Sequence, residues 1–75
     1  MKSIRNFTAV IEKEEEMYVA LCPELDVASQ GDTVEEAKAN LQEAIELLFE
    51  HASKQELETR IKGDVYITNL QIAVG

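Results

Sequence analysis

Residues 32–62 contain no glycine and no proline, and this run constrains the fold more than any other feature of the sequence. Both residue types are poorly tolerated inside helices, so a helical stretch can extend through a segment that lacks them. Thr33 followed three residues later by Glu36 forms a capping box, in which each side chain satisfies a free backbone N–H at the helix start. The sequence therefore predicts a helix that begins directly after Thr33.

The spacing of apolar residues predicts which side of this helix faces a core. Eight of them fall within one arc at about 100° per residue, namely Val34, Ala37, Leu41, Ala44, Ile45, Leu48, Phe49 and Ala52. Leu47 lies well off that arc. It is either one of the exposed leucines that are common on protein surfaces or an anchor for a partner.

A break in the helical run is expected near Ser53. Leu57 and Ile61 continue a spacing of four but project onto the side opposite Leu41, and Ser53 with Glu56 forms a second capping box. A second, short helix is therefore predicted, ending at Gly63.

Residues 4–12 and 17–22 are rich in β-branched and aromatic residues and flank the polar run at 13–16, which predicts a β-hairpin with that run as its loop. Asp26 to Gln30 is compatible with a short third strand, with Gly31 supplying a turn or bulge. Residues 65–74 form a last predicted strand. The hairpin and this last strand carry apolar residues on both faces. The predicted fold is an α+β sandwich of two layers with an antiparallel sheet, in the order β-β-β-α-(α)-β.

Chain length limits what this fold can do alone. With 75 residues it is expected to be a single domain, 1–75, that buries only about 60% of the surface its unfolded form exposes. The single Cys22 rules out an internal disulfide, so we expect a homodimer or a higher oligomer, or a complex with another protein. One cysteine, no recognisable leader and no long apolar run favour a cytoplasmic protein without membrane attachment.

The charge distribution favours a protein partner over a nucleic acid. The net charge is −8, and between residues 14 and 53 only Lys38 is basic. That interval holds eleven acids: Glu14, Glu15, Glu16, Glu24, Asp26, Asp32, Glu35, Glu36, Glu43, Glu46 and Glu50. Nucleic-acid binders gain affinity from clustered Lys and Arg, so direct binding to DNA or RNA is not expected. A basic protein would be attracted, although acidity also serves solubility alone.

The residues capable of catalysis do not form a recognisable site. Cys22 and His51 are the only residues of their types, too few for a zinc site, and nearby acids would raise the pKa of a Cys22 thiol. Glu24, Asp26 and Asp32 match no metal-binding loop. Neither an enzyme nor a metal or other cofactor is therefore expected.

The sequence from Tyr18 to Glu50, YVALCPELDVASQGDTVEEAKANLQEAIELLFE, resembles the HicB-like antitoxin family. In that family a strand ending in Pro-Glu-Leu leads through a Gln-Gly-Asp-Thr turn into a Glu-Glu-Ala helix. The residues that carry the resemblance are Pro23, Glu24, Leu25, Gln30, Gly31, Asp32, Thr33, Glu36, Ala37, Ala44 and Ile45.

This resemblance implies a partial RNase H-like fold without catalytic acids, and a prokaryotic antitoxin that neutralises HicA, a small basic toxin that cleaves messenger RNA. Full-length members usually add a C-terminal DNA-binding module, which we do not expect here. The partner-binding residues are expected to be Tyr18, Glu24, Asp26, Glu43, Glu46, Leu47 and Glu50.

Two further hypotheses remain beside the antitoxin. A stand-alone oligomeric module of the same fold would bind a partner other than a toxin. A metal-dependent nuclease would depend on a carboxylate such as Asp26.

Overall fold

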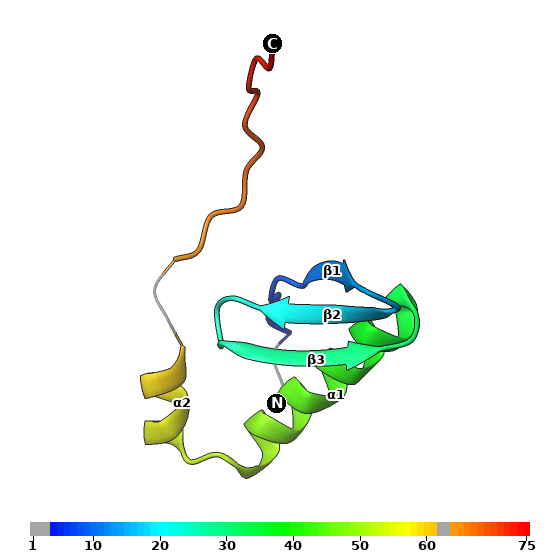
Figure 1. The fold of residues 1–75 in the computed structure, drawn as a ribbon. Helices are drawn as coiled ribbons and strands as arrows, with labels where there is room; N and C mark the ends of the chain where they lie inside the picture. The colour runs from blue at the N-terminus through cyan, green and yellow to red at the C-terminus, as the bar shows by residue number, and fades with distance from the viewer. Residues whose placement is uncertain (1–3, 62–63) are drawn as a thin grey trace.

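The computed structural model describes residues 4–61 and 64–75, and these form a sheet of three antiparallel strands followed by two helices (Figure 1). The strands are β1 (Val10–Glu14), β2 (Met17–Cys22) and β3 (Val27–Gly31), in the spatial order β1-β2-β3. The helices are α1 (Val34–His51) and α2 (Lys54–Arg60). The predicted α+β class and the order of these five elements are confirmed.

The hairpin has a tighter turn than the polar run suggested. Val10 lies opposite Leu21 and Glu14 opposite Met17, so only Glu15 and Glu16 remain as the loop. Glu15 occupies the left-handed region at φ 56°, as the turn requires. The predicted first strand also started too early. Residues 4–9 form an arm without strand pairing, because β2 ends at Cys22 and leaves the arm no backbone to pair with.

Gly31 is the last residue of β3 and not the turn or bulge that was predicted. Its φ is not positive. Glycine is needed here for space, because an added Cβ would lie 2.6 Å from the backbone nitrogen of Ala37. The close approach lets α1 begin against the end of β3.

Both predicted helix starts are confirmed, with Thr33 and Ser53 as the N-cap residues. The Thr33 hydroxyl accepts a hydrogen bond from the Glu36 N–H at 3.0 Å, and the Ser53 hydroxyl accepts one from the Glu56 N–H at 3.1 Å. The break near Ser53 is therefore confirmed. The second helix ends at Arg60, and the predicted stop at Gly63 lies outside the described residues.

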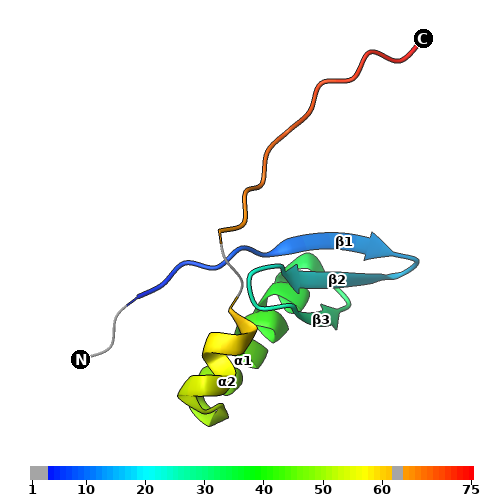
Figure 2. The same ribbon diagram turned by 90° about the vertical axis from the view of Figure 1, so that its left-hand side faces the viewer.

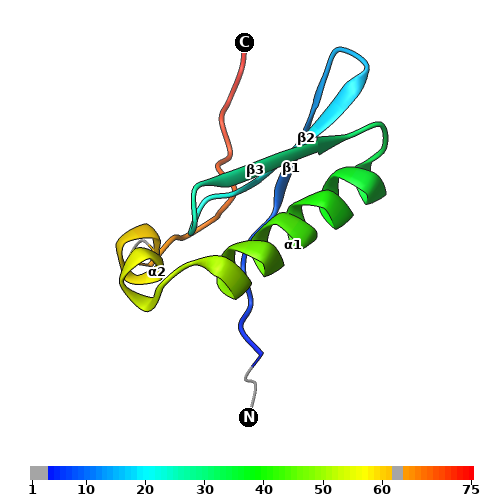
Figure 3. The ribbon, with the colours of Figure 1, turned by 90° about the horizontal axis from the view of Figure 1, so that it is seen from below.

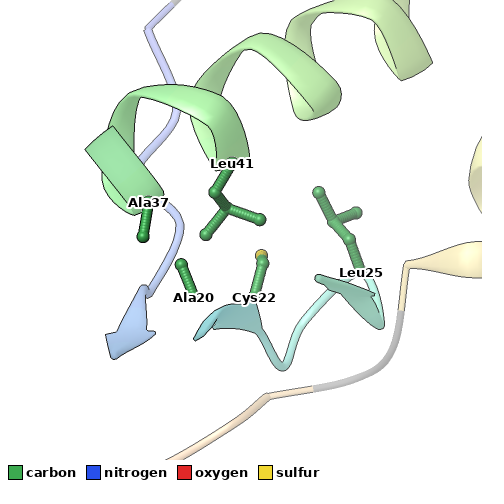
Figure 4. Close-up of a cluster of buried hydrophobic side chains, with 5 residues drawn as sticks. All are labelled: Ala20, Cys22, Leu25, Ala37 and Leu41. Carbon is green, nitrogen blue, oxygen red and sulfur yellow. The ribbon is translucent and has the colours of Figure 1, made fainter. Parts of the chain in front are cut away.

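Helix α1 crosses one face of the sheet, and the core lies between these two layers (Figure 3). Among the described residues, five hydrophobic side chains are buried: Ala20, Cys22, Leu25, Ala37 and Leu41 (Figure 4). Phe7, Ile11, Ile45 and Phe49 pack around them half-buried. The predicted core side of α1 is thus largely confirmed, except that Val34 is exposed because it lies in the first turn, ahead of the contact between Ala37 and Gly31.

The opposite face of the sheet is open among the described residues. Val10, Leu21 and Ala28 lie side by side across its three strands, and all are exposed. The prediction that the sheet is apolar on both faces therefore holds for this row.

The predicted last strand has no partner strand. Residues 64–75 extend away from the sheet and the helices and have no strand or helix assignment (Figure 2). A β-strand needs hydrogen bonds from a neighbour, and within the described chain this segment has none.

Candidate functional site

A surface that combines exposed acids with an exposed apolar side chain lies on α1. Glu43, Glu46 and Glu50 are spaced by three and four residues, which brings them onto one side of the helix. All three are exposed, and Leu47 among them is 47% exposed. We call these four residues the acidic face. They are four of the seven residues predicted to bind a partner, and the structure brings them together.

An open groove borders the acidic face, between α1 and the arm at residues 4–9. Phe7, Leu41, Ile45 and Phe49 provide its apolar surface. The rings of Phe7 and Phe49 lie 5.6 Å apart, centre to centre, which ties the arm to the helix. The acidic residues of α1 therefore form the rim of an apolar depression.

Basic groups also reach this groove. Lys38 is exposed on its wall, and the guanidinium of Arg5 lies 5.3 Å from the centre of the Phe7 ring. This distance is within the range of a cation–π interaction. The rim thus offers charges of both signs, with the acids concentrated toward the C-terminal half of α1.

The other three predicted site residues lie apart from the acidic face. Tyr18 is half-buried on the side of β2 that faces the helix, with the Lys13 ammonium 6.0 Å from its ring centre. Asp26 is exposed in the turn between β2 and β3 at φ 56°, beside a shallow depression that it shares with Arg60. Neither residue contacts the groove.

Glu24 has a structural role inside the domain. Its carboxylate accepts hydrogen bonds from the Thr8 N–H at 3.0 Å and from the Thr8 hydroxyl at 2.7 Å. Pro23 ends the pairing of β2, and the carboxylate then serves as the acceptor for the arm. Burial raises the pKa of Glu24, but the hydrogen bonds from Thr8 outweigh it and hold the pKa below its ordinary value.

Cys22 is buried beneath α1 and makes a 3.6 Å hydrogen bond from its Sγ to Glu24. Burial raises the pKa of this thiol, and Glu24 raises it further. A thiolate is the reactive form, so the surroundings of Cys22 disfavour nucleophilic chemistry. Cys22 instead packs in the core as a small apolar residue.

Among residues 4–61 and 64–75, no three His, Cys, Asp or Glu side chains come close enough together to hold a metal ion. No helix in the same residues has the length and apolar character needed to cross a membrane.

Phe7 and Arg5 are the groove residues that sequence reasoning missed. Phe7 was placed on a strand, yet it reaches α1 from the arm before β1. The available signal was Pro23, which has no N–H to donate and ends strand pairing: β2 stops at Cys22, so residues far upstream of Val10 have no strand to join.

Fold and surface together define a small two-layer α+β protein with an acidic helix beside an apolar groove. Among curated proteins, the chain is 42% identical over 66 residues to a UPF0150 protein of Helicobacter pylori, covering 87% of this chain and 92% of that relative. It is 39% identical over 59 residues to a UPF0150 protein of Thermotoga maritima, covering 73% and 79% respectively. The chain belongs to the UPF0150 family.

A third relative, UPF0150 protein ssr1765 of Synechocystis, is 53% identical over 51 residues, and the match spans 65% of this chain and 65% of that protein. No protein-family profile matches the sequence. No solved structure matches it either.

Proposed function

We propose that this protein is a HicB-like antitoxin that binds a small basic toxin of the HicA type and covers the surface with which the toxin holds RNA. The observation that carries the proposal is the acidic face, where three exposed carboxylates surround the exposed Leu47 beside an apolar groove. The resemblance of residues 18–50 to HicB-like proteins supports the same assignment.

The physical basis of the proposal is complementary charge with an apolar anchor. A net charge of −8 attracts a basic protein at long range and speeds its encounter. Binding energy at interfaces is concentrated in a few well-packed side chains. Leu47, which is 47% exposed, provides such a contact, and the surrounding glutamates orient the partner.

The test is a titration of the purified protein with a HicA-type toxin at low and at high salt. Calorimetry measures the affinity, and an RNA-cleavage assay measures the activity of the toxin. We expect a complex that weakens as salt rises, together with protection of the RNA. The triple variant Glu43→Gln, Glu46→Gln, Glu50→Gln should bind the toxin at least ten-fold more weakly.

The matched control removes three acids from outside the acidic face: Glu56→Gln, Glu58→Gln, Asp64→Asn. Both triple variants change the net charge from −8 to −5, so only position differs. Equal weakening by the two variants would show that charge alone acts and that the acidic face is not the site. Absence of any complex at low salt would end the antitoxin proposal.

A stand-alone oligomeric module with a partner other than a toxin is the second candidate. The exposed apolar residues 65–74 favour it, because they provide a binding segment that requires no toxin. An oligomer that forms no complex with a HicA-type toxin and leaves RNA cleavage unchanged would support this candidate.

A further inference from the structure

The C-terminal segment, residues 65–74, exposes more apolar surface than any other part of the described chain. Tyr66 is 85% exposed, Leu70 81%, Ile72 72% and Val74 88%. None of the ten residues VYITNLQIAV is charged. An uncharged exposed segment with high β-propensity is an aggregation hazard unless something pairs with it.

The side chains of the C-terminal segment alternate as a strand requires. Tyr66, Leu70, Ile72 and Val74 share one face with a threonine between them. The other face begins with Val65 and Ile67 and continues with Asn69, Gln71 and Ala73. One face is therefore suited to an apolar surface and the other is more polar toward its C-terminal end.

The sheet offers two edges for an added strand, and they differ in accessibility. At β3 the side-chain amide of Asn40 donates to the Gln30 carbonyl at 2.8 Å, so part of this edge is already occupied. At β1 the described chain provides no partner beyond β2. Exposed edges of this kind are templates for strand addition.

The free edge of β1 continues into the arm that borders the groove. Helix α1 packs mainly against β3 and β2 and much less against β1, so its apolar side at Ile45 and Phe49 is left beside the arm, in the groove. A fourth strand next to β1 would place its apolar face over this groove. An extended strand with one apolar face would therefore fit both the groove and the free edge of β1.

We propose that two copies of this chain exchange their C-terminal segments, each of which adds as a fourth strand to the free edge of β1 in the other copy. The face formed by Tyr66, Leu70, Ile72 and Val74 packs over the groove of the partner copy. Main-chain hydrogen bonds to β1 hold the segment, and the apolar face sets its register.

The direction of the segment favours exchange between copies over folding back onto the same copy. It leads away from the sheet and helices in both Figure 1 and Figure 2, and the molecule is 52 Å long but only 28 Å and 20 Å across. A two-fold exchange covers both segments and both β1 edges at once, which closes the assembly. In such a dimer the groove is covered by the C-terminal segment, so a toxin would contact the acidic face alone. The two tests that follow contain no toxin, so their outcome is separate from that of the toxin titration.

The first test is the matched pair Ile72→Asp and Gln71→Asp, measured by light scattering on the full chain at micromolar concentration. Both changes add one carboxylate at neighbouring exposed positions, so the two variants carry the same net charge. We expect the native protein and Gln71→Asp to be dimers. The dissociation constant of the Ile72→Asp dimer should be at least ten-fold higher. A monomeric native protein, or equal behaviour of the two variants, would overturn the proposal.

The second test locates the contact. Isotope-labelled and unlabelled protein are unfolded together, refolded as a mixture and studied by NMR filtered for contacts between copies. We expect contacts between residues 66–74 of one copy and residues 9–13 of the other. Contacts of these two segments within one copy only, or of residues 66–74 with any other surface, would refute strand exchange at β1.

Discussion

The carboxylate of Glu24 accepts hydrogen bonds from both the backbone N–H and the hydroxyl of Thr8, sixteen residues earlier in the chain. Strand β2 ends directly before Pro23, which has no N–H to donate. The side chain of Glu24 extends the contact between the two halves of the hairpin past this point. It thereby fixes the arm that borders the groove.

Stability should depend on the ionisation of Glu24. The folded state holds its pKa below the ordinary value of 4.5, so the stabilisation is present above that value and is lost as the pH falls through the lower, folded-state pKa. When thermal unfolding is measured between about pH 6 and pH 3, the midpoint temperature should fall more steeply for the native protein than for Glu24→Gln. Glu46→Gln, an exposed control with the same charge change, should follow the native curve.

The hydroxyl of Thr8 contributes separately. Thr8→Val keeps the backbone N–H and the shape of the side chain but removes the 2.7 Å hydrogen bond to Glu24. A hydrogen bond to a charged group is worth about 1.5 to 3 kcal/mol, so denaturant unfolding should show a loss of about 2 kcal/mol. An unchanged midpoint would mean that water replaces this bond without cost.

Gly31→Ala should separate β3 from the start of α1. The new methyl group would lie 2.6 Å from the Ala37 nitrogen and 2.9 Å from the Glu36 carbonyl carbon, both backbone atoms that cannot turn aside. Overpacking of this kind costs about 1 to 3 kcal/mol in the free energy of unfolding. Gly75→Ala is the control, because nothing lies within 4 Å of its added Cβ.

Leu41→Ala should be the most damaging change on α1. Leu41 is 2% exposed between the helix and the sheet, and truncating a buried leucine costs about 2 to 5 kcal/mol. Leu47→Ala removes the same atoms from a residue that is 47% exposed and should change stability by less than about 1 kcal/mol. Similar losses for the two variants in chemical denaturation would place Leu47 in a buried contact as well.

Cys22 should resist thiol reagents while the protein is folded. It is buried, and burial raises its pKa, so thiolate is scarce at neutral pH. A chromogenic disulfide reagent should react at least ten-fold more slowly with the native protein than with the protein in denaturant. Rapid labelling of the native protein would indicate that α1 opens readily from the sheet.

The helices could be predicted from sequence because their signals are local. Thr33 with Glu36, and Ser53 with Glu56, mark helix starts through contacts only three residues apart. The hairpin boundaries depended on how far β2 runs before Pro23, which is a property of the pairing. For the same reason the composition of residues 65–74 predicted a strand but could not supply the neighbour that a strand requires.

Partner-binding residues were predictable to different degrees. The acids on α1 follow from helical spacing, and the structure does bring Glu43, Glu46 and Glu50 together. Glu24 carries the same charge, yet its carboxylate is engaged by Thr8. Sequence alone does not distinguish a carboxylate that faces solvent from one that accepts a hydrogen bond from a backbone N–H sixteen residues earlier in the chain.

Within residues 4–61 and 64–75, the fully buried part of the core consists of five hydrophobic residues, none larger than leucine. If two copies exchange their C-terminal segments as proposed, association adds to the stability of this small core. Its unfolding midpoint should therefore rise with its own concentration, and a cell that stops making it would lose the folded form to proteolysis faster than dilution alone would explain. Synthesis sets the concentration of the protein, and the concentration sets the fraction of molecules that are associated and folded. The rate of synthesis would then affect how long each molecule survives.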